Sequence, residues 1–369
     1  MFKKGFVWWG IVLGVLSLLI RVVVSPEWVE RYYSRGFFQL FRMFWDTMLT
    51  SWFPIALIYI LFLILLARFA RAVYRWTKHK GVDRLWSLLA GLLGFAGWLI
   101  FSFLLMWGYN YGRIPVEQKL GLELQAPARE VLEAQIRQEA AQLALLRARI
   151  EGADTATLSP RVFSADMEEQ LRDGLEEVLT YYNYPVVGTV RGRVLYPRGI
   201  FLRFSSAGLY LPWTGEGHID GGLLLVQQPY TLAHELAHGY GFGDEGTCSF
   251  WAYLTAFRVE DPALQYAIRL GYWRRLAIGW ARVDQQGYDA FRATLAPGMI
   301  ADLEAINANN AAYPDIMPRF RNAAYDSYLK AQGIAEGMQN YGKVVLMVEA
   351  WRKDAALFIN EDFPAEADE

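Results

Sequence analysis

The residues best suited to chemistry stand in one short stretch, HELAHGYGFGDE, which covers residues 234–245. On an α-helix, residues four apart share a face, so His234 and His238 could both direct an imidazole at one ion. Glu235 stands beside them and could accept a proton from a water molecule that the ion polarises. The order HExxH on a helix is typical of zinc sites that cleave peptide bonds. The stretch therefore predicts a zinc ion held by the two histidines, with Glu235 as general base; the alternative is a surface helix with a chance histidine pair.

A catalytic zinc usually has three protein ligands and one open position, so a third ligand is expected. Three glycines between residues 239 and 243 should end the helix and reverse the chain, which brings the following carboxylates close to the histidines. Glu245 is the favoured ligand, because a glutamate that opens the next helix (residues 245–258) is typical of gluzincins. Asp244 comes second, at the end of a metzincin-like HExxHxxGxxD pattern. Glu260 comes third, at a longer spacing before Asp261 and Pro262.

The elements that must position this motif can be predicted from the second half of the chain. Apolar residues recur at helical spacing in residues 126–151 and 167–182, and nearly everything from residue 229 to residue 358 has helical character. Residues 186–211 are rich in Val, Leu, Phe, Tyr and Gly and alternate in VRGRVLY and GIFLRF, which predicts two or three strands. His218 lies in GEGHIDGG and is expected in a glycine-rich turn. Residues 113–369 therefore predict an α-rich domain with a small sheet just before the motif helix, an α+β class.

The first half of the chain is different, because it contains three long apolar runs. They cover about residues 5–25, 52–70 and 85–109, and each is long enough for a membrane-spanning helix. The alternative of three buried core helices is less favoured, because charge-free runs this long rarely occur in soluble domains. Residues 68–84, at the end of the second run and before the third, contain six basic residues against one acid, Asp83, and such segments are expected to stay in the cytoplasm. Residues 1–112 are thus predicted to form a membrane domain, with the N-terminus in the cytoplasm.

This topology places residues 113–369 outside the cytoplasm, in the periplasm if the protein lies in a bacterial inner membrane. The loop between the first two runs contains GFFQLFRMFW, which we expect to form a helix lying in the membrane interface. The balance of 36 Lys and Arg against 38 Asp and Glu argues against a nucleic-acid partner. The single cysteine, Cys248, excludes an intrachain disulfide and is expected to pack in a helix.

Several motifs together resemble a known family, the uncharacterised bacterial membrane proteins grouped as domain of unknown function 3810. They are, in order, GLYLPWTGE, PYTLAHELAHGYGF, FWAYL and YLKAQGIAEGMQNYGKVV. The resemblance covers nearly the whole chain and implies a zinc metallopeptidase of unknown substrate. Family members tend to continue the motif as ExEANF, whereas this chain has EGTCSF, with Glu245 kept and Thr247 at the second acidic position. If that second glutamate is the family's third ligand, this chain needs Asp244 or Glu245 in its place.

Two further roles follow from zincin-like enzymes in general. Tyr341, in the NYG of the last matching segment, is a candidate for stabilising an oxyanion opposite the zinc; core packing is the alternative. Residues 202–211, just before the motif helix, could pair with the backbone of a substrate.

The sequence as a whole predicts a membrane-anchored, zincin-like zinc metallopeptidase. Its metal ligands would be His234, His238 and Glu245, its catalytic residues Glu235 and Tyr341, and its partners membrane lipid and a peptide or protein substrate at the membrane or in the periplasm. The alternative is a catalytically inactive membrane-anchored binding or scaffold protein with a structural or decayed zinc site. A protease with its motif inside the bilayer is disfavoured, because no apolar run of spanning length surrounds the motif.

Overall fold

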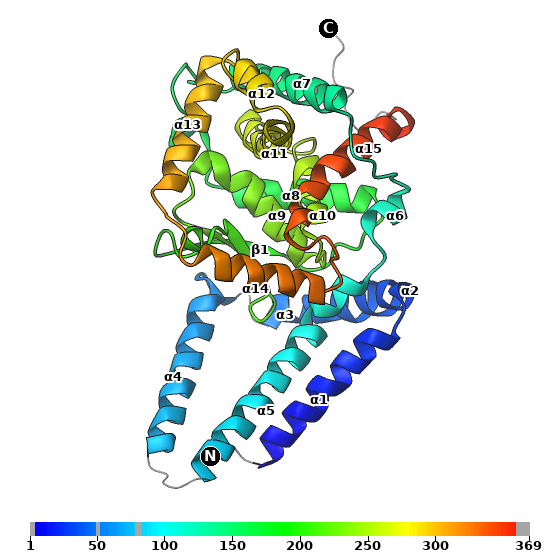
Figure 1. Cartoon of the computed structure of the whole chain (residues 1–369), viewed down its shortest axis with the longest axis vertical. Coiled ribbons are helices and arrows are strands. Elements are labelled where there is room, and N and C mark those ends of the chain that lie inside the picture. The colour runs from blue at the N-terminus through cyan, green and yellow to red at the C-terminus, as the bar shows by residue number, and fades with distance from the viewer. Residues whose placement is uncertain (1–3, 49–51, 78–82, 359–369) are drawn as a thin grey trace. The chain divides into compact units, whose positions relative to one another are not determined.

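The computed structural model describes residues 4–48, 52–77 and 83–358, and its helices and strands group into two compact units. The first unit comprises residues 1–114 with two short later segments, 187–189 and 211–216, and the second comprises the remaining residues. Most of the described chain is helical, and a three-stranded sheet is present, as the α+β prediction requires (Figure 1).

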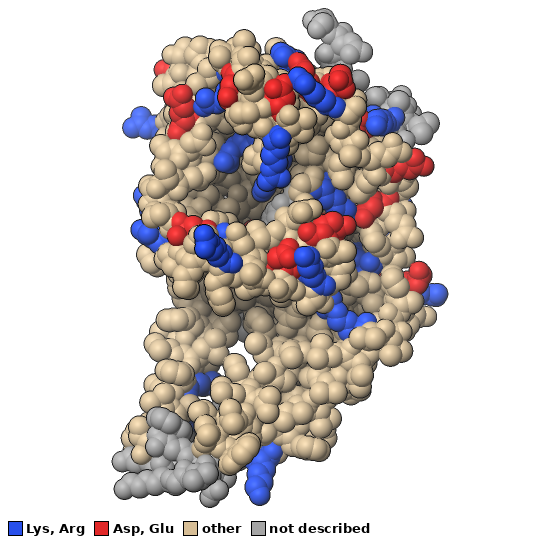
Figure 2. Space-filling view, viewed as in Figure 1, with Lys and Arg blue, Asp and Glu red and all other residues tan. Residues whose placement is uncertain are grey.

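Three helices of the first unit are long and apolar enough to cross a membrane: α1 (Lys4–Val23), α4 (Leu57–Thr77) and α5 (Asp83–Met106). They coincide with the three predicted runs, and Figure 2 shows few charged side chains on them. Helix α4 begins later than predicted, at Leu57. Pro54 explains the difference, because it disfavours helical backbone at the residue before it. The predicted basic loop is described only in part, since residues 78–82 lie outside the described ranges.

Helices α1 and α5 pack through glycines. A β-carbon added at Gly97 would lie 2.1 Å from the Gly10 carbonyl oxygen, and one at Gly14 would lie 2.7 Å from the Gly97 Cα. In a membrane, small residues let two helix backbones approach closely, so that van der Waals packing holds the pair together. These glycines therefore fix the distance between the two helices.

Between α1 and α4 the chain forms α2 (Pro26–Trp28), the π-helix η1 (Val29–Phe37) and α3 (Phe38–Met48), which run across the ends of α1 and α5 (Figure 1). Helix α3 buries polar side chains, including Arg42 and Asp46, and exposes apolar ones. The exposed apolar side chains include Leu40, Met43 and Phe44. This is the reverse of a helix facing water and suits a helix at a membrane interface.

The segment 211–216 completes the first unit. Arg42 donates hydrogen bonds to the Asp46 carboxylate (2.8 Å) and to the Gly215 carbonyl oxygen (2.7 Å). Trp213 Nε1 donates to Ser102 Oγ at 3.0 Å. The Leu57 N–H donates to Glu216 Oε2 at 2.8 Å, so a fully buried carboxylate satisfies the first amide of α4.

The second unit is built on a buried helical core. Figure 1 shows its elements, whose bounds are α6 (Val116–Leu120), α7 (Arg129–Ala148), α8 (Met167–Tyr181), α9 (Gln228–Gly239), α10 (Glu245–Thr255), α11 (Pro262–Val283), α12 (Gln285–Arg292), α13 (Pro297–Ala311), α14 (Pro318–Ala331) and α15 (Lys343–Phe358). Short 3-10 helices lie between these elements, at η4 (Pro160–Val162), η5 (Leu202–Phe204), η6 (Leu225–Gln227) and η7 (Gly337–Gly342). Another, η3 (Gly108–Gly112), follows α5 in the first unit. The helices predicted at residues 126–151, 167–182 and 229–358 are confirmed within a few residues at their ends.

The sheet has the order β1-β3-β2, with β1 (Arg191–Leu195), β2 (Gly208–Leu211) and β3 (Glu216–Asp220). Two expectations were wrong. The alternating stretch GIFLRF forms a turn and the 3-10 helix η5, where the Asp220 carboxylate accepts hydrogen bonds from the amides of Gly199, Phe201 and Leu202. In the stretch GEGHIDGG, expected to be a turn, residues 216–220 form the fully buried central strand β3.

Helix α10 lies at the centre of the second unit, because every one of its 11 residues is buried. It packs against α8, α9 and α15, and its aromatic residues Trp251 and Tyr253 are fully buried. The Tyr253 hydroxyl donates to the buried Glu139 carboxylate of α7 (2.7 Å), which also accepts from Arg269 of α11 (3.0 Å). A helix held this firmly gives its first residue, Glu245, a defined position.

Candidate metal centre

The motif lies on α9, which begins with Pro229 in its first turn and ends at Gly239. Two residues further on, Gly241 has a φ of 92°, a left-handed conformation that favours glycine and reverses the chain. Helix α10 then starts at Glu245, and the Asp244 side chain caps it by accepting from the Thr247 N–H at 2.7 Å. The sequence therefore brings the start of α10 back beside the histidine face of α9, as predicted.

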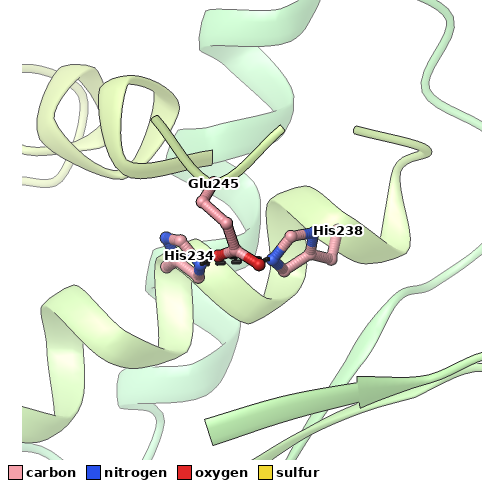
Figure 3. A group of neighbouring side chains, drawn as sticks. All are labelled: His234, His238 and Glu245. Atoms are coloured by element: carbon pink, nitrogen blue, oxygen red, sulfur yellow. Dashed lines mark hydrogen bonds and ion pairs between the residues drawn. The ribbon is translucent and has the colours of Figure 1, made fainter. Parts of the chain in front are cut away.

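His234, His238 and Glu245 meet in the buried space between these two helices (Figure 3). Glu245 Oε2 lies 3.1 Å from His234 Nε2 and 3.5 Å from His238 Nε2, and the two Nε2 atoms lie 3.2 Å apart. Ligands about 2.0–2.2 Å from a tetrahedral zinc lie roughly 3.3–3.6 Å from one another. The observed spacing is close to this value, so the three residues could hold a metal ion.

Each of these side chains has a partner on the side away from the group. His238 Nδ1 lies 2.7 Å from the Phe242 carbonyl oxygen, to which it donates, and His234 Nδ1 lies 3.2 Å from Ser249 Oγ. Glu245 Oε1 accepts from the Tyr325 hydroxyl at 2.8 Å. Such outer partners orient imidazoles and carboxylates so that the remaining atoms face an ion.

Cys248 lies behind His238. Its Sγ is 3.3 Å from His238 Nδ1 and 3.4 Å from the Phe242 carbonyl oxygen, on the side away from the three facing ligand atoms. Burial raises the pKa of the Cys248 thiol to about 11. The side chain in this position packs against the imidazole, as expected from the sequence.

Burial and mutual contact shift the pKa values of the group. Burial lowers the pKa of His234. For His238, burial acts in the same direction, but Cys248 and Glu245 outweigh it and raise the pKa well above its usual range. Burial would raise the pKa of Glu245, but the two histidines outweigh it and hold that pKa well below its usual range. The Glu245 carboxylate is therefore stabilised in its ionised form by positive charge beside it. A bound cation would supply positive charge at the same place.

Glu235 lies on the side of α9 that faces the sheet. A β-carbon added at Gly208 of β2 would lie 2.6 Å from Glu235 Oε1, and one at Gly217 of β3 would lie 2.8 Å from Glu235 Cβ. The backbone N–H of Tyr210 donates to the Glu235 carboxylate, whose Oε2 is buried without a hydrogen-bond partner among the described residues. Burial raises the pKa of Glu235 to about 8. Glycine at both positions lets the two strands pass directly over this side chain.

The other candidate ligands do not meet the histidines. Asp244 uses one carboxylate oxygen for its helix cap, and the other accepts from Asn340 Nδ2 (2.8 Å) and Lys343 Nζ (3.2 Å). Glu260 is exposed, in the link between α10 and α11. Thr247, two residues after Glu245, is buried, and the carboxylate that reaches the histidines comes from Glu245.

His218 and Tyr325 differ from what the sequence predicted. His218, expected in a turn, is buried on β3, with its Nδ1 3.2 Å from the Leu209 carbonyl oxygen. Tyr325 was not predicted at all, because nothing in its own stretch, AAYDSYLK, indicates a metal site. Tyr341 lies in η7, and its side chain is outside the described part of the structure, so its catalytic role stays a prediction.

Comparison with known proteins places the chain in a family of unknown function. A family model described as "Protein of unknown function (DUF3810)" matches residues 33–348, which include every residue of the candidate centre. No curated protein and no solved structure matches the chain.

Proposed function

We propose that this chain, which belongs to the DUF3810 family, is a membrane-anchored, zincin-like zinc metallopeptidase. The observation that carries the proposal is the meeting of three buried ligand atoms from α9 and α10, with spacings of 3.1–3.5 Å, beside a buried glutamate. Two imidazoles and a carboxylate match a gluzincin-like zinc site with one position open. A zinc ion there supplies Lewis-acid chemistry, which polarises a carbonyl oxygen and a water molecule.

The proposed role of Glu235 is to hold and move a proton. Its Oε2 is buried without a partner among the described residues, so this oxygen is available to accept a proton from the attacking water. The same oxygen would then pass that proton to the leaving amine. The pKa of about 8 applies to the metal-free group, and a nearby cation would lower it and favour the ionised base.

The proposed substrate is a peptide or protein at the membrane or in the periplasm. Strand β2 lies at one edge of the sheet and passes over Glu235. An extended peptide can add to such an edge through backbone hydrogen bonds, which would place its carbonyl groups along the site. The three apolar helices and the basic loop support a bacterial inner-membrane location with a cytoplasmic N-terminus and a periplasmic second unit.

Metal content is the first test. Elemental analysis of the detergent-purified full chain should find about one zinc ion per chain. His238→Ala and Glu245→Ala should lose it, because each removes one of the facing ligand atoms. Asp244→Ala is the matched carboxylate control and should keep the metal. A wild-type chain that neither contains metal nor can be loaded with it would contradict the proposal.

Catalysis needs a separate test, because a metal site can also be structural. Glu235→Gln should keep the metal and lower cleavage of a quenched-fluorescent peptide library by about 10²–10⁴-fold. Wild-type cleavage that is abolished by a chelator and restored by zinc would support the peptidase. Metal-loaded wild type without cleavage, matched by an unchanged Glu235→Gln phenotype in cells, would favour the binding or scaffold alternative.

A further inference from the structure

The second unit has an unusual concentration of exposed apolar side chains at one place. Eleven large apolar side chains are exposed in its described part, and eight of them lie in residues 194–209 and 316–320. Five of these eight, with exposures of 42–72%, are Ile200, Phe204, Ile316, Met317 and Phe320. Single exposed apolar residues are normal, but a contiguous group marks an interaction site.

These five side chains belong to one surface, because hydrogen bonds join the two segments. The Ile316 N–H donates to the Arg203 carbonyl oxygen at 2.7 Å, and Arg321 donates to the Phe204 carbonyl oxygen. Ser205 Oγ donates to Asp315 Oδ2 at 2.7 Å. Helix α14, which carries Phe320, buries only Leu329 among its residues. The first turn of α14 and the loop around η5 therefore form a single exposed surface.

The same surface also carries basic side chains. Residues 194–205 and 313–321 contain four arginines and one acid, Asp315. Asp315 is already paired with Arg321 at 2.8 Å. The other three arginines are exposed, and they are Arg198, Arg203 and Arg319. Apolar side chains flanked by arginines suit the boundary between anionic lipid headgroups and acyl chains.

We propose that this apolar–basic surface, formed by these five apolar side chains with Arg198, Arg203 and Arg319, docks onto an anionic lipid bilayer. Two observations favour lipid as the occupant. The charge complements anionic headgroups, and the three long apolar helices keep the chain at a bilayer. The second unit would then hold this one face against the bilayer surface.

Site-directed labels on the full chain test the proposal. Nitroxide labels would be placed at Met317→Cys or Phe320→Cys, with Leu145→Cys on α7 as the control because Leu145 is similarly exposed at 62%. The native Cys248 is fully buried and should not label. In nanodiscs containing phosphatidylglycerol, labels at 317 and 320 should become several-fold less accessible to an aqueous nickel chelate, while the label at 145 should not change.

Charge variants then separate lipid from other occupants. Arg319→Gln should lower the equilibrium constant for docking about fivefold in anionic discs, whereas Arg149→Gln, at an exposed arginine outside this surface, should not. Equal accessibility at 317, 320 and 145 in every disc would overturn the proposal. Equal protection in amphipol, where no bilayer exists, would overturn it as well and assign the surface to a second copy of the chain.

Discussion

At the candidate metal centre, each of the three facing residues also contacts at least one residue outside the group. Ser249 contacts His234, the Phe242 carbonyl oxygen accepts from His238, and Tyr325 donates to Glu245. Of these, only the Tyr325 contact comes from a distant part of the chain, 80 residues after Glu245. It also comes from α14, a mostly exposed helix, so it links a lightly packed element to the centre.

Removing the Tyr325 hydroxyl should weaken metal binding without abolishing it. Tyr325→Phe leaves Glu245 in place but takes away the hydrogen bond that orients its carboxylate. Loss of such an outer partner typically lowers metal affinity about 10–100-fold. Chelator competition on the purified protein would measure the change. Tyr328→Phe, which alters the ring stacked on Tyr325 at 6.0 Å, is the control and should bind metal as wild type does.

The sequence allowed the three facing residues to be proposed because local geometry brings them together. His234 and His238 share a helix face, and the glycine-rich turn returns the chain within six residues. Tyr325 could not be found in this way, since its contact depends on tertiary packing. The choice between Asp244 and Glu245 also needed the structure, because a helix cap and a metal ligand have the same sequence signature of an acid at a helix start.

At the scale of elements, strand β2 packs closely against helix α9 at Gly208, because a glycine leaves room for the Glu235 side chain. Gly208 faces Glu235 Oε1, and an added β-carbon would also lie 2.7 Å from the His218 carbonyl oxygen. Sequence alternation did not reveal this arrangement. It predicted a strand at GIFLRF, where local turns form instead, and missed β3, whose glycines obscure the alternating pattern.

Gly208→Ala should therefore push β2 away from α9. Overpacking of this kind costs about 1–3 kcal/mol, so the thermal unfolding temperature should fall while the metal content stays unchanged. Gly279→Ala on α11 is the matched control, because its β-carbon would lie 3.8 Å from Leu132 Cδ2, at ordinary contact distance. A Gly208→Ala protein as stable as the control would show that β2 does not pack tightly on Glu235.

The two apolar helices α1 and α5 allow a similar comparison within the first unit. Gly97→Ala adds a methyl group 2.1 Å from a backbone oxygen of α1 and should separate the helices. The control is Gly5→Ala in α1, which has nothing within 4 Å of the added atom and should be neutral or slightly stabilising through the helix propensity of alanine. Thermal stability in detergent should then fall for Gly97→Ala alone.

For the molecule as a whole, the topology is the main prediction. A reporter enzyme that is active only outside the cytoplasm should be active when fused after Arg113 and inactive when fused after Thr77. The reason is that a loop rich in basic residues, such as the one between the second and third apolar helices, is expected to stay in the cytoplasm. Activity after Thr77 would invert the orientation and place the candidate metal centre in the cytoplasm. The three apolar helices themselves could be predicted well, because length and apolar composition alone identify them as candidate spans.

The cap of α4 has a consequence for the order in which this protein is made. The carboxylate that satisfies the Leu57 amide belongs to Glu216, 159 residues later in the chain. At about 5–20 residues per second, a ribosome needs roughly 10 to 30 seconds to synthesise that interval. Helix α4 is therefore translated in full well before its cap exists. The formation of α4 and its capping are separate events, and the second must wait until the β2–β3 turn has been translated.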